Sequence, residues 1–367
     1  PPADAPSYTP AMAEVRPFRG LRYAPDIDPA LTIAPPYDVI SAAQQDALYG
    51  RSPHNVVRVE YGRAQAPDTE TDNRYTRAAR DLRAWRDAGV LRLDHAPALY
   101  AYRQEFTWAG QRYARHAVFT ALRLEEWAKG VVRPHEHTLA NPKADRMSLL
   151  RATRTQVSPV YSIVRPMQSA QLPEPRGDVV LDCEADGQRH VLSAVTDAAA
   201  IVAYAAAVEH AGVYIADGHH RYETALAYRD EVRAAATRWT GDEPENFVLM
   251  ALTAADGPGL LVLPTHRLVS PRHVPSDGDA RIAARFDVRD LGAMPLDGAM
   301  AALGSATAPS FLMAGPGPGS LRLLTLRDRA GVEALMPSEQ SAAWKRLDVN
   351  VLQYGILLDV FGIDASE

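Results

Sequence analysis

Apolar and polar positions alternate along the chain in two periods, one typical of helices and one of strands. Residues 71–90 repeat large apolar side chains at helical spacing and stop near Gly89, which predicts an amphipathic helix with Tyr75, Ala78, Leu82 and Trp85 on its buried face. Residues 98–127 instead alternate around an Ala-Gly pair, the pattern of a long antiparallel hairpin. The chain is therefore expected to mix helices and strands.

Further elements follow from caps, turns and β-branched runs. A helix over 41–50 is capped by Ser41, and a second helix is expected to begin near Pro142. The same signals predict a strand at 55–62, a strand at 160–166, a hairpin at 182–191, a helix at 196–212, paired strands across 246–269 with a turn at Asp-Gly-Pro-Gly, and a closing helix at 347–362.

The organisation expected from these elements is an α+β fold with mixed sheets and flanking helices. No repeat of 20 to 50 residues argues for a solenoid. Residues 1–16 read as a flexible lead-in without a secretion signal, 17–271 as the main domain, and 272–367 as a smaller C-terminal α/β subdomain, where short helices and strands alternate.

Composition narrows the class of protein. The chain has 367 residues, 47% of them hydrophobic, which suits about two globular domains. With 45 acidic and 39 basic residues the net charge of −6 offers no global attraction for nucleic acid or an anionic membrane. A single cysteine, Cys183, excludes an intrachain disulfide and fits a cytoplasmic location. No apolar run is long enough for a transmembrane helix.

The stretch Asp-Gly-His-His-Arg, residues 217–221, places four titratable side chains within five residues. It follows a β-branched and aromatic run and precedes an amphipathic pattern, so Gly218 is expected to form a tight turn, with His219, His220 and Arg221 in the first helical turn. Free backbone N–H groups there suit phosphate, and an arginine adds a fork of donors. The simpler alternative is that Asp217 only caps the helix.

A second cluster, Arg-Pro-His-Glu-His-Thr at 133–138, places Glu136 between two histidines as a candidate general base. His135 and His137 project oppositely in an extended chain, which makes a shared metal a poor fit. Lys143 and Arg146 follow, either as a solvated first helical turn or as phosphate contacts.

Two further segments could bind a substrate. Asp38 lies in a turn stiffened by two prolines, which would position its side chain or serve the fold alone. His266 and Arg267 interrupt an apolar run, as a cleft-lining pair or as the exit of a strand.

These segments resemble, in order and over nearly the whole chain, a bacterial and archaeal family known as domain of unknown function 1015. The resemblance rests on FRGLRYAP, APPYDVIS, RSPHNVVRVE, RPHEHT, ADGHHRYETALAYRDE, LPTHRLV and LDVNVLQYGILLDVFG. Two motifs are also similar to those of the archaeal free L-serine kinase, whose scaffold is shared with ParB partition proteins and sulfiredoxin. In that enzyme a Pro-His-Glu segment supplies the catalytic glutamate and Asp-Gly-His-His-Arg holds nucleotide phosphates.

The kinase resemblance implies a decorated ParB/sulfiredoxin-like core and a transfer of phosphate to serine, giving O-phosphoserine. It implies Glu136 as base, with Asp217 and His220 beside it, and phosphates of ATP, ADP or pyrophosphate on residues 218–221. We further expect Mg²⁺ to bridge the phosphates, and Asp217 to bind that metal or the ammonium group of serine. Lys143 and Arg146 would add phosphate contacts. Asp38, His266 and Arg267 would bind the substrate, with His266 and Arg267 at its carboxylate or at the transferred phosphoryl group.

Other classes of function stay open. A ParB-like nucleotide switch would use the same turn, but no basic helix-turn-helix accompanies it, and no nucleic acid or membrane partner is expected. A metal-dependent hydrolase or nuclease would use the histidines, and a noncatalytic scaffold has little need of a base and a phosphate turn. The sequence does not indicate the oligomeric state.

Overall fold

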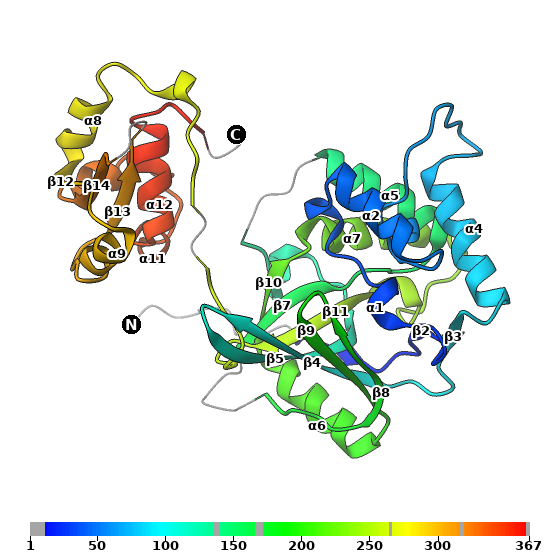
Figure 1. Cartoon of the computed structure of the whole chain (residues 1–367). Coiled ribbons are helices and arrows are strands. Elements are labelled where there is room, and N and C mark those ends of the chain that lie inside the picture. Colours follow the sequence, from blue (N-terminus) through cyan, green and yellow to red (C-terminus); the bar gives the residue numbers. More distant parts are fainter. Residues whose placement is uncertain (1–11, 136–139, 166–171, 264–265, 316–318, 365–367) are drawn as a thin grey trace, which may run out of the picture. The chain divides into compact units, whose positions relative to one another are not determined.

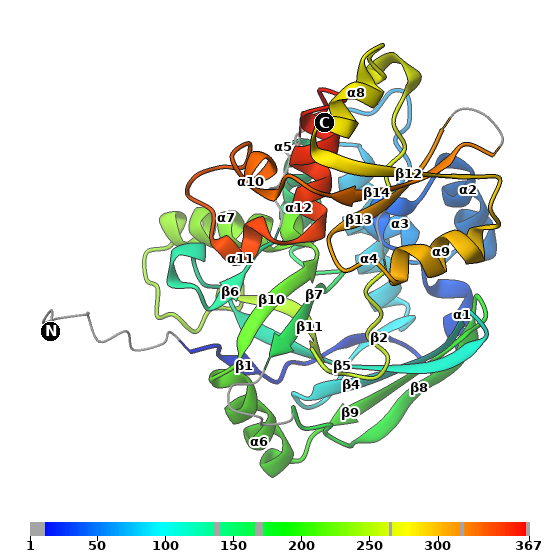
Figure 2. The same ribbon diagram turned by 90° about the vertical axis from the view of Figure 1, so that its left-hand side faces the viewer.

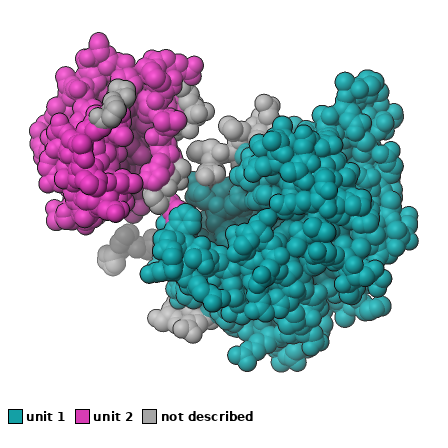
Figure 3. All heavy atoms as spheres, viewed as in Figure 1, with its two compact units in different colours: residues 1–262 teal, residues 263–367 magenta. Residues whose placement is uncertain are grey.

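The computed structural model describes residues 12–135, 140–165, 172–263, 266–315 and 319–364. The chain divides into two compact units, Pro1–Val262 and Leu263–Glu367, which Figure 3 shows in different colours. The expected C-terminal subdomain was placed from residue 272, so the second unit begins earlier than the sequence suggested. The overall class is α+β with mixed sheets and flanking helices.

A mixed sheet forms the centre of the first unit. In the described ranges it has nine strands, in the order β6-β10-β7-β11-β5-β4-β9-β8, with β1 paired to β5. Its members are β1 (Val15–Arg16), β4 (Leu99–Trp108), β5 (Gln111–Arg123), β6 (Val132–Arg133), β7 (Val160–Arg165), β8 (Asp178–Ala185), β9 (Gln188–Val195), β10 (Gly212–Asp217) and β11 (Phe247–Ala254). A separate pair joins β2 (Leu21–Tyr23) to β3 (Leu91–Leu93).

Helices flank this sheet. Figures 1 and 2 show α2, α4, α5 and α7 gathered on one side of it and α6 on the other. The helices of this unit are α1 (Pro29–Thr32), η1 (Tyr37–Val39), α2 (Ala42–Arg51), α3 (Val57–Glu60), α4 (Arg74–Asp87), η2 (Trp127–Lys129), α5 (Ala140–Thr153), α6 (Ala198–Glu209), α7 (His219–Ala235) and η3 (Pro244–Asn246).

The main core joins strand side chains to α6 and α7. Leu99, Leu122 and Met250 from the strands pack in one cluster with Tyr204 of α6 and Tyr222 of α7. All five side chains are fully or almost fully buried. Burial of this area is the main force that fixes α7 against the sheet, and with it the turn at the start of that helix.

Several elements agree with the predictions from sequence. The Ser41 hydroxyl accepts from the backbone N–H of Gln44 in a capping box at the start of α2. In α4, Ala78, Leu82 and Trp85 are buried together, as their spacing predicted. Strands β4 and β5 form the expected hairpin across Ala109 and Gly110, both with positive φ.

Residues 55–62 were predicted as a strand, and this prediction is wrong. Val57–Glu60 is a single helical turn, α3. The side chain of Asn55 determines the fold here: its Oδ1 accepts from the N–H of Val57, and its Nδ2 donates to the carbonyls of Leu31 and Ile33. These bonds hold the chain in a turn, and Val57 and Val59 are then buried from a helix instead of a strand.

The paired strands expected across 246–269 are also corrected. Strand β11 forms, but among the described residues that follow it, 255–263 and 266–269, the chain is not a strand. The reason is that β5 pairs with one side of β11 and β7 with the other. Both sides of β11 are occupied at residues 250–252, which leaves no continuous side for a hairpin partner.

The second unit is a three-stranded sheet with helices. Its elements are η4 (Pro271–His273), α8 (Gly278–Arg285), β12 (Phe286–Gly292), α9 (Leu296–Gly304), β13 (Ser310–Ala314), β14 (Leu321–Leu326), α10 (Arg329–Glu333), α11 (Ala342–Lys345), α12 (Asp348–Leu352) and the π-helical η5 (Gln353–Leu358). Phe286 and Leu324 form its core with Val351 and Ile356 of the closing helix.

Candidate functional site

The turn at residues 217–221 adopts the strand-to-helix form that the sequence predicted. Strand β10 ends at Asp217, and the 17-residue helix α7 starts at His219. Gly218 between them has φ +93°, in the left-handed region that favours glycine. A Cβ there would also lie 2.9 Å from Nε of Arg221. The position needs glycine for both reasons, and helix α7 begins directly after it.

The pairing of β10 is irregular at its end. Its pairing with β7 shifts in register between Ile215 and Asp217. Such irregularities bend a strand and redirect the side chain that follows. The Asp217 carboxylate is 51% exposed at this point.

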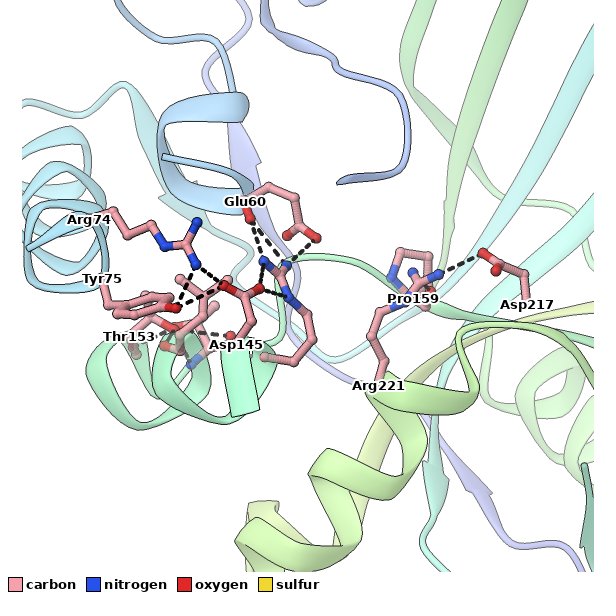
Figure 4. Close-up of polar contacts among 11 residues, drawn as sticks. Glu60, Arg74, Tyr75, Asp145, Thr153, Pro159, Asp217 and Arg221 are labelled. Carbon is pink, nitrogen blue, oxygen red and sulfur yellow. Dashed lines mark hydrogen bonds and ion pairs between the residues drawn. The ribbon is translucent and has the colours of Figure 1, made fainter. Parts of the chain in front are cut away.

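Arg221 reaches back to close the turn. Its Nη2 donates to Oδ2 of Asp217 at 2.6 Å, and its Nη1 donates to the carbonyl of Pro159, just before β7. Nε is buried and makes no hydrogen bond in the described residues. Arg221 thus ties three segments together, and two of its three nitrogens are already engaged (Figure 4).

The Pro-His-Glu segment meets this turn through parallel strands. Strand β6 lies beside β10 with Val132 opposite Val213. Both strands therefore leave the sheet at the same edge, and the residues after them come together although about eighty positions separate them in sequence. This parallel pairing was not foreseen from the sequence.

His135 makes the contact between the two motifs. Its backbone N–H donates to Nε2 of His219 at 3.3 Å, and its ring Nδ1–H donates to the carbonyl of Ile215 at 2.6 Å. The two imidazoles meet edge to face with 4.5 Å between their centroids. His219 is only 4% exposed. Glu136 and His137, the next residues, lie outside the described part of the chain.

Lys143 and His220 lie near the start of α7. Lys143 Nζ pairs with Oε2 of Glu223 at 3.0 Å, which links α5 to α7. His220 follows His219 in the first turn of α7 and is half-buried.

Arg146 has a different environment from the one its proposed phosphate contact requires. It is 6% exposed, and its nitrogens donate to Asp145 and to both the side chain and the carbonyl of Glu60. The Tyr37 ring covers its guanidinium at 3.9 Å. Asp145 also accepts from Arg74, so the cluster joins α3, α4 and α5 (Figure 4). Because its donors are saturated, Arg146 supports the fold and does not contact phosphate.

Glu60 was missed by the sequence analysis as a candidate. It ends the RSPHNVVRVE segment and is 5% exposed. Burial raises its pKa, while the charges of Arg146 and Arg221 oppose that rise. The available signal was a glutamate at the end of a valine-rich run, Val56-Val57-Arg58-Val59.

A small cavity is lined by both arginines, with apolar and polar side chains around it. It has a volume of about 50 Å³ and is lined by Glu60, Arg146, Ser158, Arg221 and Thr224 among others. The Thr224 hydroxyl is buried without a hydrogen bond in the described residues, like Nε of Arg221. The interior beneath the turn therefore has polar atoms that the protein itself leaves unsatisfied.

The remaining candidates are placed as follows. Asp38 is exposed in η1, next to the Tyr37 that covers Arg146. His266 and Arg267 are exposed in the second unit, whereas the turn at 217–221 belongs to the first. Among the described residues, which do not include His137, no three histidine, cysteine or acidic side chains gather to hold a metal.

Comparison with known proteins identifies the family. A family model described as "Protein of unknown function (DUF1015)" matches residues 15–350. The chain belongs to the DUF1015 family. No curated protein and no solved structure matches this DUF1015 chain. The matched range includes Asp38, Glu60 and Arg267, as well as the motifs at 133–138 and 217–221.

Among the helices of the described ranges, none has the length and apolar character that a bilayer crossing requires.

Proposed function

We propose that this DUF1015 protein is a phosphotransferase that moves a phosphoryl group from a nucleotide or pyrophosphate to the hydroxyl of free L-serine, giving O-phosphoserine. The observation that supports it most is the bond from the His135 N–H to His219. It brings the residue before Glu136 to the start of α7, where phosphate oxygens are favoured. A base and a phosphate site in one place are the minimum that such a transfer requires.

The roles of the residues follow from their surroundings. The backbone N–H groups after Gly218, together with His220, bind the phosphates, since a helix start favours anions. Arg221 holds Asp217 and the turn in place through its two engaged nitrogens. Glu136 accepts the proton of the serine hydroxyl as its oxygen attacks phosphorus and the bond to the donor's bridging oxygen breaks.

A divalent cation fits the exposed carboxylate. Mg²⁺ commonly binds one or two carboxylates together with substrate phosphates, and Asp217 is a half-exposed carboxylate at the phosphate turn. Bound there, the ion would neutralise developing charge on the phosphoryl oxygens. We further propose that the mixed sheet is an enlarged ParB/sulfiredoxin-like scaffold, and that the serine is held in part by Asp38.

Direct assay of the product tests the proposal. Purified protein is incubated with Mg²⁺, ATP, ADP or pyrophosphate, and serine, threonine or homoserine, and phosphoamino acids are measured by mass spectrometry. O-phosphoserine formation supports the proposal. Nucleotide hydrolysis without any phosphoamino acid would favour a ParB-like switch instead, and failure to bind any donor would refute both.

Two matched substitutions test the base. Glu136→Gln should lower turnover by about a hundredfold or more while donor affinity stays near that of the natural protein, because an amide cannot accept the proton. Glu70→Gln, which changes an exposed carboxylate before α4, is the control and should leave turnover unchanged. Equal turnover in both variants would remove Glu136 from the mechanism.

A further inference from the structure

One cavity of the first unit has none of the residues 217–221 in its lining. It has a volume of about 690 Å³, within the range of small-molecule sites. Trp85 and Leu82 of α4 line it from one side, and Phe119 and Ala121 of β5 and Leu249 of β11 line it from the sheet. We name this cavity the apolar chamber.

A gap in the sheet explains why the chamber exists. Strand β7 pairs with β11 only from Met250 onward, so Phe247–Leu249 has no strand neighbour on that side. The side chain of Gln156 takes its place: its Nε2 donates to the carbonyl of Phe247 at 2.8 Å, and its Oε1 accepts from the N–H of Leu249 at 2.6 Å. The backbone is satisfied there without a strand that would fill the volume.

The chamber adjoins the small cavity that Arg146 and Arg221 line. Leu150, Gln156, Val157 and Ala225 are among the residues that line both. An occupant of the chamber therefore lies next to the wall that includes Arg221, although the chamber itself is lined mainly by apolar groups. Water in such a space finds few partners, which favours an apolar occupant.

The charged residues of the chamber are unevenly balanced. Four arginines line it, against two acidic residues, Asp242 and Glu245. Arg16 pairs with Asp242 and Glu14, and Arg22 pairs with Asp94.

The other two arginines are exposed and have no acidic partner in the described residues. Arg19 donates only to the backbone carbonyl of Asp94, and the side chain of Arg154 makes no hydrogen bond or ion pair there. Their two positive charges are available at the border of an apolar space.

We infer that the apolar chamber is a binding site for a small amphipathic anion, with its aromatic or aliphatic body among Trp85, Phe119 and Leu249 and its anionic group at Arg19 and Arg154. Burial of the body supplies most of the affinity, and the arginines select the charge. The inference does not depend on the proposed phosphotransfer, since none of these residues belongs to the turn.

Two fluorescent probes of the same shape and different charge test the site. The probes are 8-anilino-1-naphthalenesulfonate, which is an anion, and N-phenyl-1-naphthylamine, which is neutral. The full chain in its native state should bind each probe saturably with one molecule per protein, and each should displace the other. Absence of saturable one-to-one binding by both would overturn the inference.

Substitutions then locate the probes. Ala121→Trp adds an indole to the chamber and should abolish binding of both, with native near-ultraviolet circular dichroism as the check of folding. If Ala121→Trp does not fold, Leu192→Trp takes its place, because Leu192 of β9 also lines the chamber. Unchanged binding in a folded filled variant would place the probes elsewhere and overturn the inference.

Charge selection is tested by the double variant Arg19→Ala/Arg154→Ala. The double variant should raise the dissociation constant of the anionic probe by about tenfold or more, and change that of the neutral probe by less than about twofold. Arg151→Ala is the matched control, because Arg151 is an exposed arginine of α5, three residues before Arg154, that pairs with Glu231 and does not line the chamber. If the double variant lost affinity equally for both probes, or lost none for the anionic probe, the assigned role of the arginines would be overturned.

Discussion

Arg146 and Arg221 line the same small cavity, but their guanidinium groups are satisfied to different degrees. Each nitrogen of Arg146 donates to Glu60 or Asp145, and an aromatic ring covers its face. Arg221 has a buried Nε without a partner in the described residues, and it pairs with an aspartate that is half exposed. Both arginines were expected from the sequence to contact phosphate.

The difference distinguishes an arginine whose donors are all used within the protein from one that keeps a donor without a partner in the described residues. A buried charge with all donors paired has no capacity for a ligand, and removal of one partner leaves an uncompensated charge. An arginine beside an exposed carboxylate and a helix start has room for a ligand nearby. The surroundings of the two side chains, and not the residue type, decide which one supports function.

The largest effect is expected on removing Arg146. Arg146→Ala should lower the free energy of unfolding by about 3–5 kcal/mol, because Glu60 stays buried without its partner. Arg221→Ala should lower it by only about 1–2 kcal/mol, since Asp217 can turn to water. Urea denaturation of both variants measures the two losses.

Arg151→Ala serves as the control for this pair, because its ion pair with Glu231 is exposed on both sides. Only a small loss is expected there. Equal losses in the Arg146 and Arg221 variants would contradict the distinction between the two arginines.

A smaller effect is expected at Gly218. Gly218→Ala should cost about 1–2 kcal/mol from the left-handed backbone alone, with a further loss because the new Cβ approaches Arg221. Gly110→Ala is a matched control: its φ is +78° and no atom lies within 4 Å of the added Cβ. Denaturation of both variants isolates the contact with Arg221, and an equal loss would mean that Arg221 moves away freely.

Local signals in the sequence determined much of the fold correctly. The capping box at Ser41, the apolar stripe of α4 and the turn at Gly218 each depend on residues within a few positions of one another. For such elements the sequence carries the physical cause directly. The same holds for the hairpin at Ala109 and Gly110, where alternation and turn residues agree.

Features set by distant contacts were not predictable in this way. Val57 and Val59 favour a strand by themselves, but the bonds from Asn55 to Leu31 and Ile33 fix a helical turn. The arrangement of the site depends on the parallel pairing of β6 with β10, which no local pattern indicates. The burial of Arg146 likewise depends on Glu60 from another helix.

A smaller effect is expected from pH, which changes the charge of Glu60 in its buried pair with Arg146. Burial raises the pKa of Glu60 above its ordinary value of 4.5. A carboxyl group whose pKa is raised by folding contributes stability below the unfolded pKa, and this contribution is lost as pH rises through the folded pKa. In Glu60→Gln that loss is absent.

The expected result is a difference that falls with pH. The unfolding free energy of the natural protein minus that of Glu60→Gln should decrease above pH 4.5, by at most about 1.4 kcal/mol per pH unit. Urea titrations at pH 4, 5, 6 and 7 measure it. A difference that increases with pH would mean that Arg146 outweighs burial and lowers the pKa.

The smallest effect is expected for the ion pair between Lys143 and Glu223, which joins α5 to α7 beside the turn. The two side chains are 38% and 25% exposed, so water and salt screen their attraction. A double-mutant cycle with Lys143→Ala and Glu223→Ala should give a coupling of about 0.2–1 kcal/mol, and 1 M salt should reduce it. The pair of Arg146 and Glu60 is buried, and a cycle on it should give a larger coupling that changes little with salt. If the Lys143 cycle were equally large and insensitive to salt, exposure would not be what distinguishes the contacts around the turn from those of the buried cluster.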